Sequence, residues 1–177
     1  MAEIIRHLTK DDFDGIFSIL SRSFPEVEYR NREEQKALFS EPWYRVYGYE
    51  KDGVLVGVLA VWELDSVRFG EHLAVDPDCR NGGIGKQLIS WYLEQSDRPF
   101  VLEVEIPDND LARRRVGFYQ RLGLTLNEFP YLQMPLREGD EPLPLYIMSY
   151  PHPVSEADFA AQKREIYARV YHVFEEV

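Results

Sequence analysis

A single cysteine, Cys79, stands among the 177 residues, so the chain cannot form an internal disulfide. One cysteine also excludes a cysteine-based metal framework. The four histidines lack the short ligand spacings of a zinc site; they are His7, His72, His152 and His172. We therefore expect neither a structural nor a catalytic metal.

Long apolar runs and an excess of positive charge are absent as well. No segment approaches the ~20 apolar residues of a membrane-spanning helix, and the N-terminal segment lacks the apolar stretch of a signal peptide. We therefore expect a cytoplasmic protein without membrane association. The formal net charge of −11 argues against a nucleic acid partner, because phosphate binding needs a positive surface. It permits a cationic or amine substrate, although an acidic surface more often only maintains solubility.

The composition is that of a folded globular chain, with 45% hydrophobic and 29% charged residues. There is no internal repeat, low-complexity tract or linker, so residues 1–177 are expected to form a single domain. Helices are predicted after the capping box at Thr9–Asp12 and over residues 32–39, 84–95, 111–122 and 155–174. Strands are predicted over residues 43–49, 54–62, 67–75, 100–106, 124–129 and 143–149. This order favours an α/β (α+β) fold with a mixed sheet flanked by helices.

The loop before the predicted helix at residue 84 is the most informative segment. Gly82, Gly83 and Gly85 let the backbone approach a ligand and point successive N–H groups at it. The start of the helix adds unpaired N–H groups and the positive end of its dipole, and Arg80 and Lys86 add charge. Together these features are typical of a pyrophosphate site. A tight strand-to-helix turn needs the same glycines, and the glycines alone favour that simpler explanation.

Two nucleotide-binding motifs fit this loop badly. A phosphate-binding P-loop would need glycine at position 80 and serine or threonine at 87, where this chain has Arg80 and Gln87. The dinucleotide fingerprint would need glycine at position 88, which is Leu88.

A family resemblance shifts the balance toward a ligand site. The run Arg80-Asn-Gly-Gly-Ile-Gly85 resembles the [Q/R]-x-x-G-x-[G/A] signature of the GNAT superfamily of N-acetyltransferases. Downstream, Phe118-Tyr-Gln-Arg-Leu-Gly-Leu124 is similar to the family's F-Y-x-x-L-G-F segment. The resemblance covers about residues 3–150. It implies a mostly antiparallel sheet in which the parallel strands at 67–75 and 100–106 splay apart at the acetyl-CoA site.

The resemblance also implies which residues hold acetyl-CoA, the cosubstrate. Backbone N–H groups of the loop would bind the coenzyme A pyrophosphate, and the preceding strand would dock the pantetheine and hold the thioester carbonyl. The cofactor-binding residues implied are Leu73, Ala74, Val75, Arg80, Asn81, Gly82, Gly83, Ile84, Gly85 and Lys86.

Catalytic roles follow from the same resemblance. Tyr119, in the F-Y segment, would donate a proton to the leaving thiolate, the alternative being that it simply packs. Glu71 is the candidate general base, the alternative being a solvated surface carboxylate. Glu103 and Glu105 alternate with apolar neighbours and are expected to share one face, which either lines the acceptor site or faces water.

Three further features leave alternatives open. The run Arg113–Arg115 near a helix start either binds an anion such as the 3′-phosphate or forms ion pairs. The family often has asparagine where this chain has Ala112, and Asn109 lies three residues earlier. The apolar stripe of the last helix, about 155–174, either closes the domain or makes a homodimer contact.

The function expected is transfer of the acetyl group of acetyl-CoA to a primary amine by direct attack. The acceptor would be a small molecule or a peptide. The alternative, from another functional class, is a GNAT-fold acyl-CoA-binding regulatory protein with little or no turnover. Tyr119 and Glu71 favour the enzyme.

Overall fold

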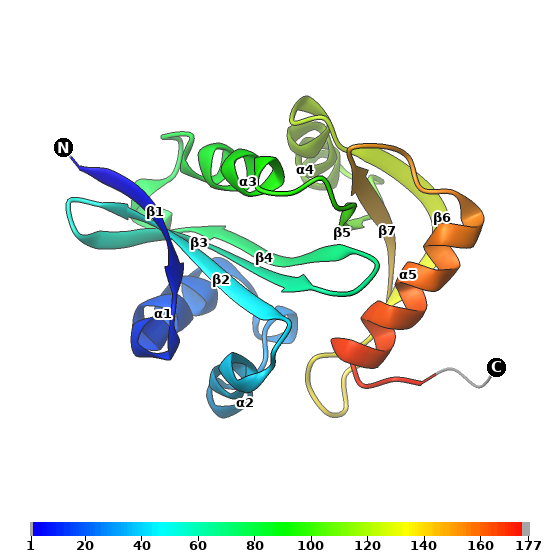
Figure 1. Cartoon of the computed structure of the whole chain (residues 1–177), viewed down its shortest axis with the longest axis horizontal. Helices are drawn as coiled ribbons and strands as arrows, with labels where there is room; N and C mark the ends of the chain where they lie inside the picture. The colour runs from blue at the N-terminus through cyan, green and yellow to red at the C-terminus, as the bar shows by residue number, and fades with distance from the viewer. Residues whose placement is uncertain (1, 175–177) are drawn as a thin grey trace. The chain divides into compact units, whose positions relative to one another are not determined.

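The computed structural model of the chain describes residues 2–174. Seven strands form one sheet in the order β1-β2-β3-β4-β5-β7-β6 (Figure 1). The chain divides into two compact units. The first runs to Glu63 and resumes over Glu71–Ser96, and the second comprises Leu64–Gly70 and the chain from Asp97 onward. No helix within residues 2–174 is long and apolar enough to cross a membrane.

The first unit is built on a β-hairpin with helices packed against it. Asp52 and Gly53 both have left-handed backbone, with φ of 50° and 80°, which suits a two-residue turn between antiparallel strands. Helices α1 and α3 both contact β3, and Figure 1 shows them on opposite sides of the hairpin. The elements are β1 (Glu3–Leu8), α1 (Phe13–Ser23), α2 (Arg32–Ala37), β2 (Tyr44–Lys51), β3 (Val54–Glu63), α3 (Ile84–Glu94) and, from β4 (Arg68–Val75), the part that begins at Glu71.

Strand β1 was not predicted. It pairs antiparallel with β2 from Glu3 opposite Lys51 to Leu8 opposite Val46. Only Leu8 of this strand is buried, so the sequence lacks the alternation that marks a half-buried strand. Pairing with β2 therefore makes this segment a strand, while its own side chains contribute little burial.

The second unit holds the parallel strand pair. Arg68, Phe69 and Gly70 of β4 lie opposite Phe100, Val101 and Leu102 of β5. A Cβ added at Gly70 would lie 2.6 Å from Cζ of Phe100, so close packing requires glycine there. The remaining elements are β5 (Phe100–Glu105), α4 (Asp110–Arg121), β6 (Thr125–Gln133), β7 (Leu143–Tyr150) and α5 (Glu156–Arg169).

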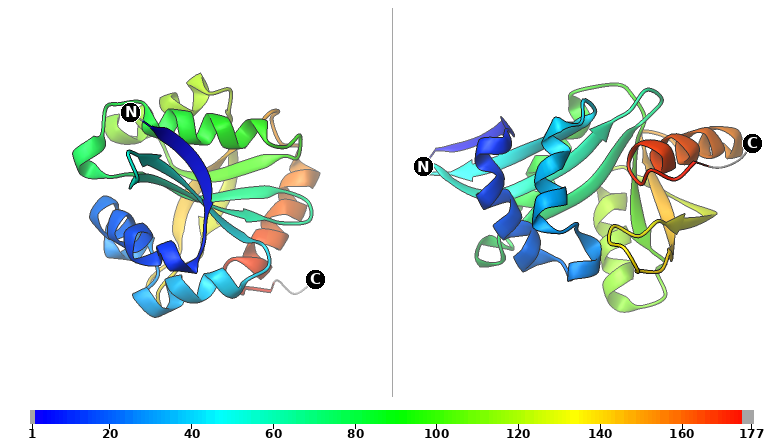
Figure 2. Two further views of the ribbon diagram at one scale, coloured as in Figure 1. Left: turned by 60° about the vertical axis from the view of Figure 1, so that its left-hand side comes forward. Right: turned by 90° about the horizontal axis from the view of Figure 1, so that it is seen from below.

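The predicted fold class is confirmed: a mixed, mostly antiparallel sheet with one parallel pair and flanking helices. Two boundaries differ by more than about two residues. Helix α5, which Figure 2 shows beside the β6–β7 hairpin, ends at Arg169 instead of near residue 174. His172 has a left-handed φ of 56°, and the N–H of Val173 binds the carbonyl of Tyr167 at 2.8 Å, so the chain turns out of the helix. Strand β6 continues to Gln133, past an irregularity between Asn127 and Tyr131.

Candidate active site

The glycine loop presents backbone N–H groups at the start of α3. Asn81 and Gly83 have left-handed backbone, with φ of 72° and 74°. Gly83 is the N-cap residue and supplies no side-chain cap, and the first intrahelical bond runs from the N–H of Gln87 to the Gly83 carbonyl at 3.0 Å. The N–H groups of Ile84, Gly85 and Lys86 therefore lack an acceptor within the helix. Such a helix start is an anion site.

The glycines of this loop are not all required by internal crowding. The atom nearest to a Cβ added at Gly82 is the Cys79 carbonyl oxygen at 3.8 Å, and at Gly85 it is Cγ2 of Val75 at 3.5 Å, both ordinary contacts. Of the three glycines in this loop, only Gly83 has a φ that restricts the residue type. The structure therefore leaves space beside Gly82 and Gly85 in which a ligand can approach the backbone.

Asp76, which follows β4, is paired with an arginine. Asp76 accepts two hydrogen bonds from the Arg22 guanidinium, at 3.1 and 2.9 Å, and another from the N–H of Asp78 at 2.9 Å. The hydrogen bonds from Arg22, followed by that from Asp78, lower the pKa of Asp76. Arg80 and Lys86 are exposed. The loop can thus receive an anionic group without repulsion from an unpaired Asp76.

Strand β4 leads directly into the loop. Ala74 is buried, whereas Leu73 and Val75 are half-buried, as strand alternation requires. The N–H of Asp76 binds the Val56 carbonyl at 2.7 Å, which ties the end of β4 to β3. The predicted cofactor residues 73–75 and 80–86 therefore lie on the end of β4, on the loop that follows it and on the start of α3, all within the first unit.

Glu71, also on β4, forms a buried ion pair with Arg30. Its carboxylate accepts hydrogen bonds from Arg30 at 2.8 and 3.1 Å, and the two side chains are 4% and 8% exposed. Burial by itself raises the pKa of Glu71, but the charge of Arg30 and the hydrogen bonds it donates outweigh burial, so the pKa is lowered. A carboxylate held in this way is a poor proton acceptor.

His72, next to Glu71 on β4, is also held by a buried contact. Its Nε2 is 2.7 Å from the Glu28 carbonyl oxygen, which can only accept, so Nε2 carries the proton. Burial lowers the pKa of His72, and Nδ1 has no hydrogen-bond partner within the described residues. Together, His72–Glu28 and Glu71–Arg30 fasten the segment before α2 to β4.

Tyr119 lies in the third turn of α4, in the second unit. Its side chain is half-buried and its ring packs edge-on against Phe118 at 5.1 Å between centroids. Burial raises the pKa of the Tyr119 phenol to about 12, against a smaller opposing effect of Arg115. The phenol is therefore fully protonated near neutral pH and can serve as a proton donor.

Helix α4 explains the departures from the family pattern. Oδ1 of Asn109 accepts a hydrogen bond from the N–H of Ala112 at 2.9 Å, so Asn109 is the N-cap of the helix. Ala112 is itself buried. Ion pairs account for two of the three arginines: Arg113 binds Asp110 at 2.6 Å and Arg115 binds Glu105 at 2.9 Å.

Glu103 and Glu105 share one face of β5, as expected, but both are occupied by protein groups. Glu103 accepts hydrogen bonds from Tyr131 at 2.5 Å, from Gln133 at 3.0 Å and from Tyr171 at 2.8 and 3.0 Å. Because a carboxylate offers about four lone-pair sites, these bonds nearly exhaust its acceptor capacity. Substrate binding by Glu103 and Glu105 stays a prediction without support from their contacts.

Sequence reasoning missed the partners that decide these roles. Arg30 lies outside every motif, and Tyr171 follows a helix whose end was predicted too late. Their contacts join residues 41 and 68 positions apart. No local pattern in a single sequence carries such a signal.

Comparisons with known proteins agree with this geometry. The acetyltransferase (GNAT) family model matches residues 13–124. A protein of Bacteroides thetaiotaomicron assigned to the GNAT family of acetyltransferases is 34% identical over 96% of this chain and 99% of its own, with a TM-score of 0.89. None of the curated proteins compared with the chain matches it significantly.

More distant structures share the fold. The Salmonella typhimurium protein yncA, solved with acetyl-CoA, is 17% identical over 89% of this chain and 99% of its own, with a TM-score of 0.62. A variant of the spermidine N-acetyltransferase from Vibrio cholerae is 16% identical over 83% of this chain and 92% of its own, with a TM-score of 0.63. The family match over more than half of the sequence and the 34% identical relative over nearly all of it show that the chain belongs to the acetyltransferase (GNAT) family.

Proposed function

We propose that this protein is an acetyl-CoA-dependent N-acetyltransferase whose acceptor is a primary amine that attacks directly. The observation that carries the proposal is the loop from Arg80 to Gly85, with its left-handed backbone at Asn81 and Gly83 and its uncapped helix start. The chain's family membership supports acetyl transfer. Cytoplasmic location and a single domain over residues 1–177 stay predictions from the sequence, as does a homodimer contact by the last helix.

Different residues of the chain would bind the cosubstrate and donate the proton. First-turn N–H groups of α3 and the charges of Arg80 and Lys86 bind the pyrophosphate. Bound acetyl-CoA would supply an activated acetyl group, whose C–S bond is exchanged for a C–N bond to the amine. The amine nitrogen loses one proton to a base, and Tyr119 donates one proton to the sulfur. Because Glu71 is bound to Arg30, we propose that it anchors β4 and that water or another group accepts the proton from the amine.

A glycine substitution tests the loop. We expect Gly83→Val to weaken acetyl-CoA binding about tenfold, because left-handed backbone costs a β-branched residue roughly 1–2 kcal/mol and the loop would rearrange to avoid it. The matched control is Gly53→Val, at a φ of 80° in the β2–β3 turn, where an added Cβ meets nothing within 4 Å. Calorimetric titration with acetyl-CoA gives the dissociation constants, and both variants carry a similar backbone strain.

Thiol release from acetyl-CoA against a panel of amines completes the test. Amine-dependent release by the wild type that is impaired in Gly83→Val and retained in Gly53→Val supports the transferase. Binding of acetyl-CoA without turnover on any amine would favour the regulatory alternative. Equal affinities of the two variants for acetyl-CoA would show that the loop is only a tight turn.

A further inference from the structure

Gln87, the fourth residue of α3, places a side-chain amide beside the glycine loop. Because helical side chains lean toward the N-terminus of their helix, this amide extends back over the loop. Its nitrogen Nε2 lies 3.8 Å from the position that a Cβ added at Gly83 would take. Within residues 2–174, Nε2 donates no hydrogen bond, and Gln87 is exposed. The amide therefore lies next to the unpaired N–H groups of the helix start.

The other end of this amide meets the Tyr49 hydroxyl. Tyr49 is on β2 and is 2% exposed, and its Oη lies 3.1 Å from Oε1 of Gln87 and 2.6 Å from Oε2 of Glu3. All three residues belong to the first unit. A phenol has one proton, so Tyr49 can donate to only one of these two oxygens at a time. The bond to the Glu3 carboxylate is the shorter one and is charge-assisted, so Glu3 is the stronger competitor.

The choice between the two oxygens decides how firmly the amide of Gln87 is held. When the Tyr49 proton goes to Oε1 of Gln87, it fixes the oxygen toward β2 and the amino group toward the loop. An anion at the loop accepts from that amino group and therefore favours this arrangement. The amide would then be bonded at both ends.

We propose that the side-chain amide of Gln87 donates a hydrogen bond to the coenzyme A pyrophosphate, and that Tyr49 positions the amide for this bond. The proposal rests on the proposed function, and it adds two residues to the anion site. Gln87 touches the ligand, whereas Tyr49 acts only through Gln87. On binding, the hydrogen bond of Tyr49 passes from Glu3 to Oε1 of Gln87.

Gln87→Glu separates a binding role from a structural one. A carboxylate in the first turn of a helix interacts favourably with the helix dipole, so the melting temperature should stay the same or rise. The same carboxylate repels an anionic ligand, and we expect the dissociation constant of acetyl-CoA to rise about 30-fold. Gln87→Leu, which removes the amide and adds no charge, should raise it about tenfold. Calorimetric titration and thermal unfolding measure the two effects.

Gln95→Glu is the matched control for the added charge. Gln95 is exposed and is the C-cap of the same helix. From residue 87 to residue 95 the helix rises about 12 Å, which exceeds the Debye length of about 8 Å at physiological ionic strength. We expect acetyl-CoA affinity to change by less than about twofold. Equal losses in Gln87→Glu and Gln95→Glu would show that net charge alone weakens binding, and the assignment of Gln87 would be wrong.

Tyr49→Phe tests the positioning role through a double-mutant cycle. The substitution keeps the ring on β2 and removes the hydroxyl. We expect acetyl-CoA affinity to fall about threefold in the wild-type background. In the Gln87→Leu background we expect no further loss, because Tyr49 acts through the amide that is already absent. The same loss in both backgrounds would show that Tyr49 only supports the strand, and its positioning role would be refuted.

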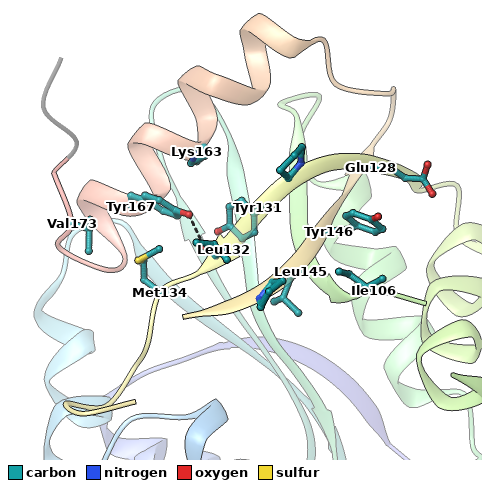
Figure 3. A pocket seen from close by; sticks show the side chains of 12 residues that line it. Ile106, Glu128, Tyr131, Leu132, Met134, Leu145, Tyr146, Lys163, Tyr167 and Val173 are labelled. Atoms are coloured by element: carbon teal, nitrogen blue, oxygen red, sulfur yellow. Dashed lines mark hydrogen bonds between the residues drawn. The ribbon is translucent and has the colours of Figure 1, made fainter. Parts of the chain in front are cut away.

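Lys163 offers a competing site for an anion. It lines a pocket of about 690 Å³ in the second unit, between α5 and the β6–β7 hairpin, and Figure 3 shows Lys163 and Tyr167 on the α5 side of this pocket. Its ammonium lies 5.4 Å from the ring centroid of Tyr167. With acetyl-CoA and inorganic pyrophosphate as the two probes, we expect Lys163→Gln to leave both affinities within about twofold. Affinity lost in Lys163→Gln and retained in Gln87→Leu would place the anion in the pocket and overturn the proposal.

The outcomes also separate this proposal from the proposed function. If acetyl-CoA binds and amines turn over, but both Gln87 variants bind it as tightly as the wild type, the assignment of Gln87 is wrong and the transferase stands. If inorganic pyrophosphate binds and depends on Gln87 while acetyl-CoA does not bind, the anion site stands and the transferase falls. If neither probe binds, both are wrong. Acetyl-CoA affinity that falls in Gln87→Leu and further in Gln87→Glu, without loss of thermal stability, supports both.

Discussion

Replacing Tyr119 by phenylalanine is expected to lower kcat about 100-fold or more while leaving acetyl-CoA affinity nearly unchanged. General acid catalysis typically contributes roughly 10²- to 10⁴-fold to a rate. The substitution removes only the hydroxyl and keeps the ring that packs against Phe118. Steady-state thiol release measures kcat, and calorimetric titration measures acetyl-CoA binding.

The pH dependence gives a second test of Tyr119. A phenol is the acid form below its pKa, and burial raises the pKa of Tyr119 to about 12. Between pH 7 and about 10, kcat should therefore show no decline from loss of this proton, whereas an ordinary tyrosine would begin to lose it toward pH 10. Tyr150→Phe, at a half-buried tyrosine of the same unit, is the control. An unchanged kcat in Tyr119→Phe would mean that Tyr119 only packs.

Removing Glu71 alone is expected to destabilise the fold by about 3–5 kcal/mol. In Glu71→Leu, the guanidinium of Arg30, 8% exposed, would be left without its carboxylate partner. Removing one partner of a buried ion pair is strongly destabilising because it leaves a buried charge without compensation. Urea unfolding monitored by tryptophan fluorescence gives the free energy of unfolding. A loss below about 1 kcal/mol would show that water reaches Arg30 and solvates it.

The double variant Arg30→Met/Glu71→Leu separates structure from catalysis. Because replacing a whole buried pair by apolar residues is often nearly neutral, we expect it to regain most of the lost stability. We also expect it to retain kcat once folded, since Glu71 acts as an anchor. A folded double variant with kcat reduced 100-fold would restore Glu71 as the general base.

The ion pair also predicts how stability varies in acid. The native pKa of Glu71 is lowered, so its stabilising contribution is complete above the unfolded-chain pKa of a glutamate, about 4.3, and is lost as the pH falls through the lower native pKa. Below about pH 4, the wild type is therefore expected to lose stability relative to the double variant, which lacks this group. Parallel acid titrations of the two proteins followed by circular dichroism would show the difference.

Much of the fold could be predicted because it depends on local signals. Thr9, Asn31 and Ser155 mark three helical starts, and in the structure each side-chain oxygen accepts a hydrogen bond from a backbone N–H of the first turn. The turn at Asp52–Gly53 specified the β2–β3 hairpin. Strand β1 was not predicted because only Leu8 is buried and its partner strand β2 is distant in the sequence, from Leu8 opposite Val46 to Glu3 opposite Lys51.

The candidate site was predictable to different degrees. The loop at Arg80–Gly85 has left-handed backbone and unpaired N–H groups at a helix start. Glycine favours such a backbone, so the sequence itself indicates the loop. The ionisable residues Glu71, Glu103 and Glu105 could be placed on strands, but their roles depended on which groups met them. All three meet protein partners, and for Glu71 this changes the expected chemistry.

Local sequence was therefore sufficient for the order of most elements, the position of the glycine loop and the tyrosine on α4, because each rests on backbone conformation or on contacts a few residues apart. Tertiary packing alone chose Arg30 as the partner of Glu71 and enclosed the pocket between α5 and the β6–β7 hairpin. A carboxylate becomes an anchor or a base according to the charges and solvent around it, and those come from distant parts of the chain.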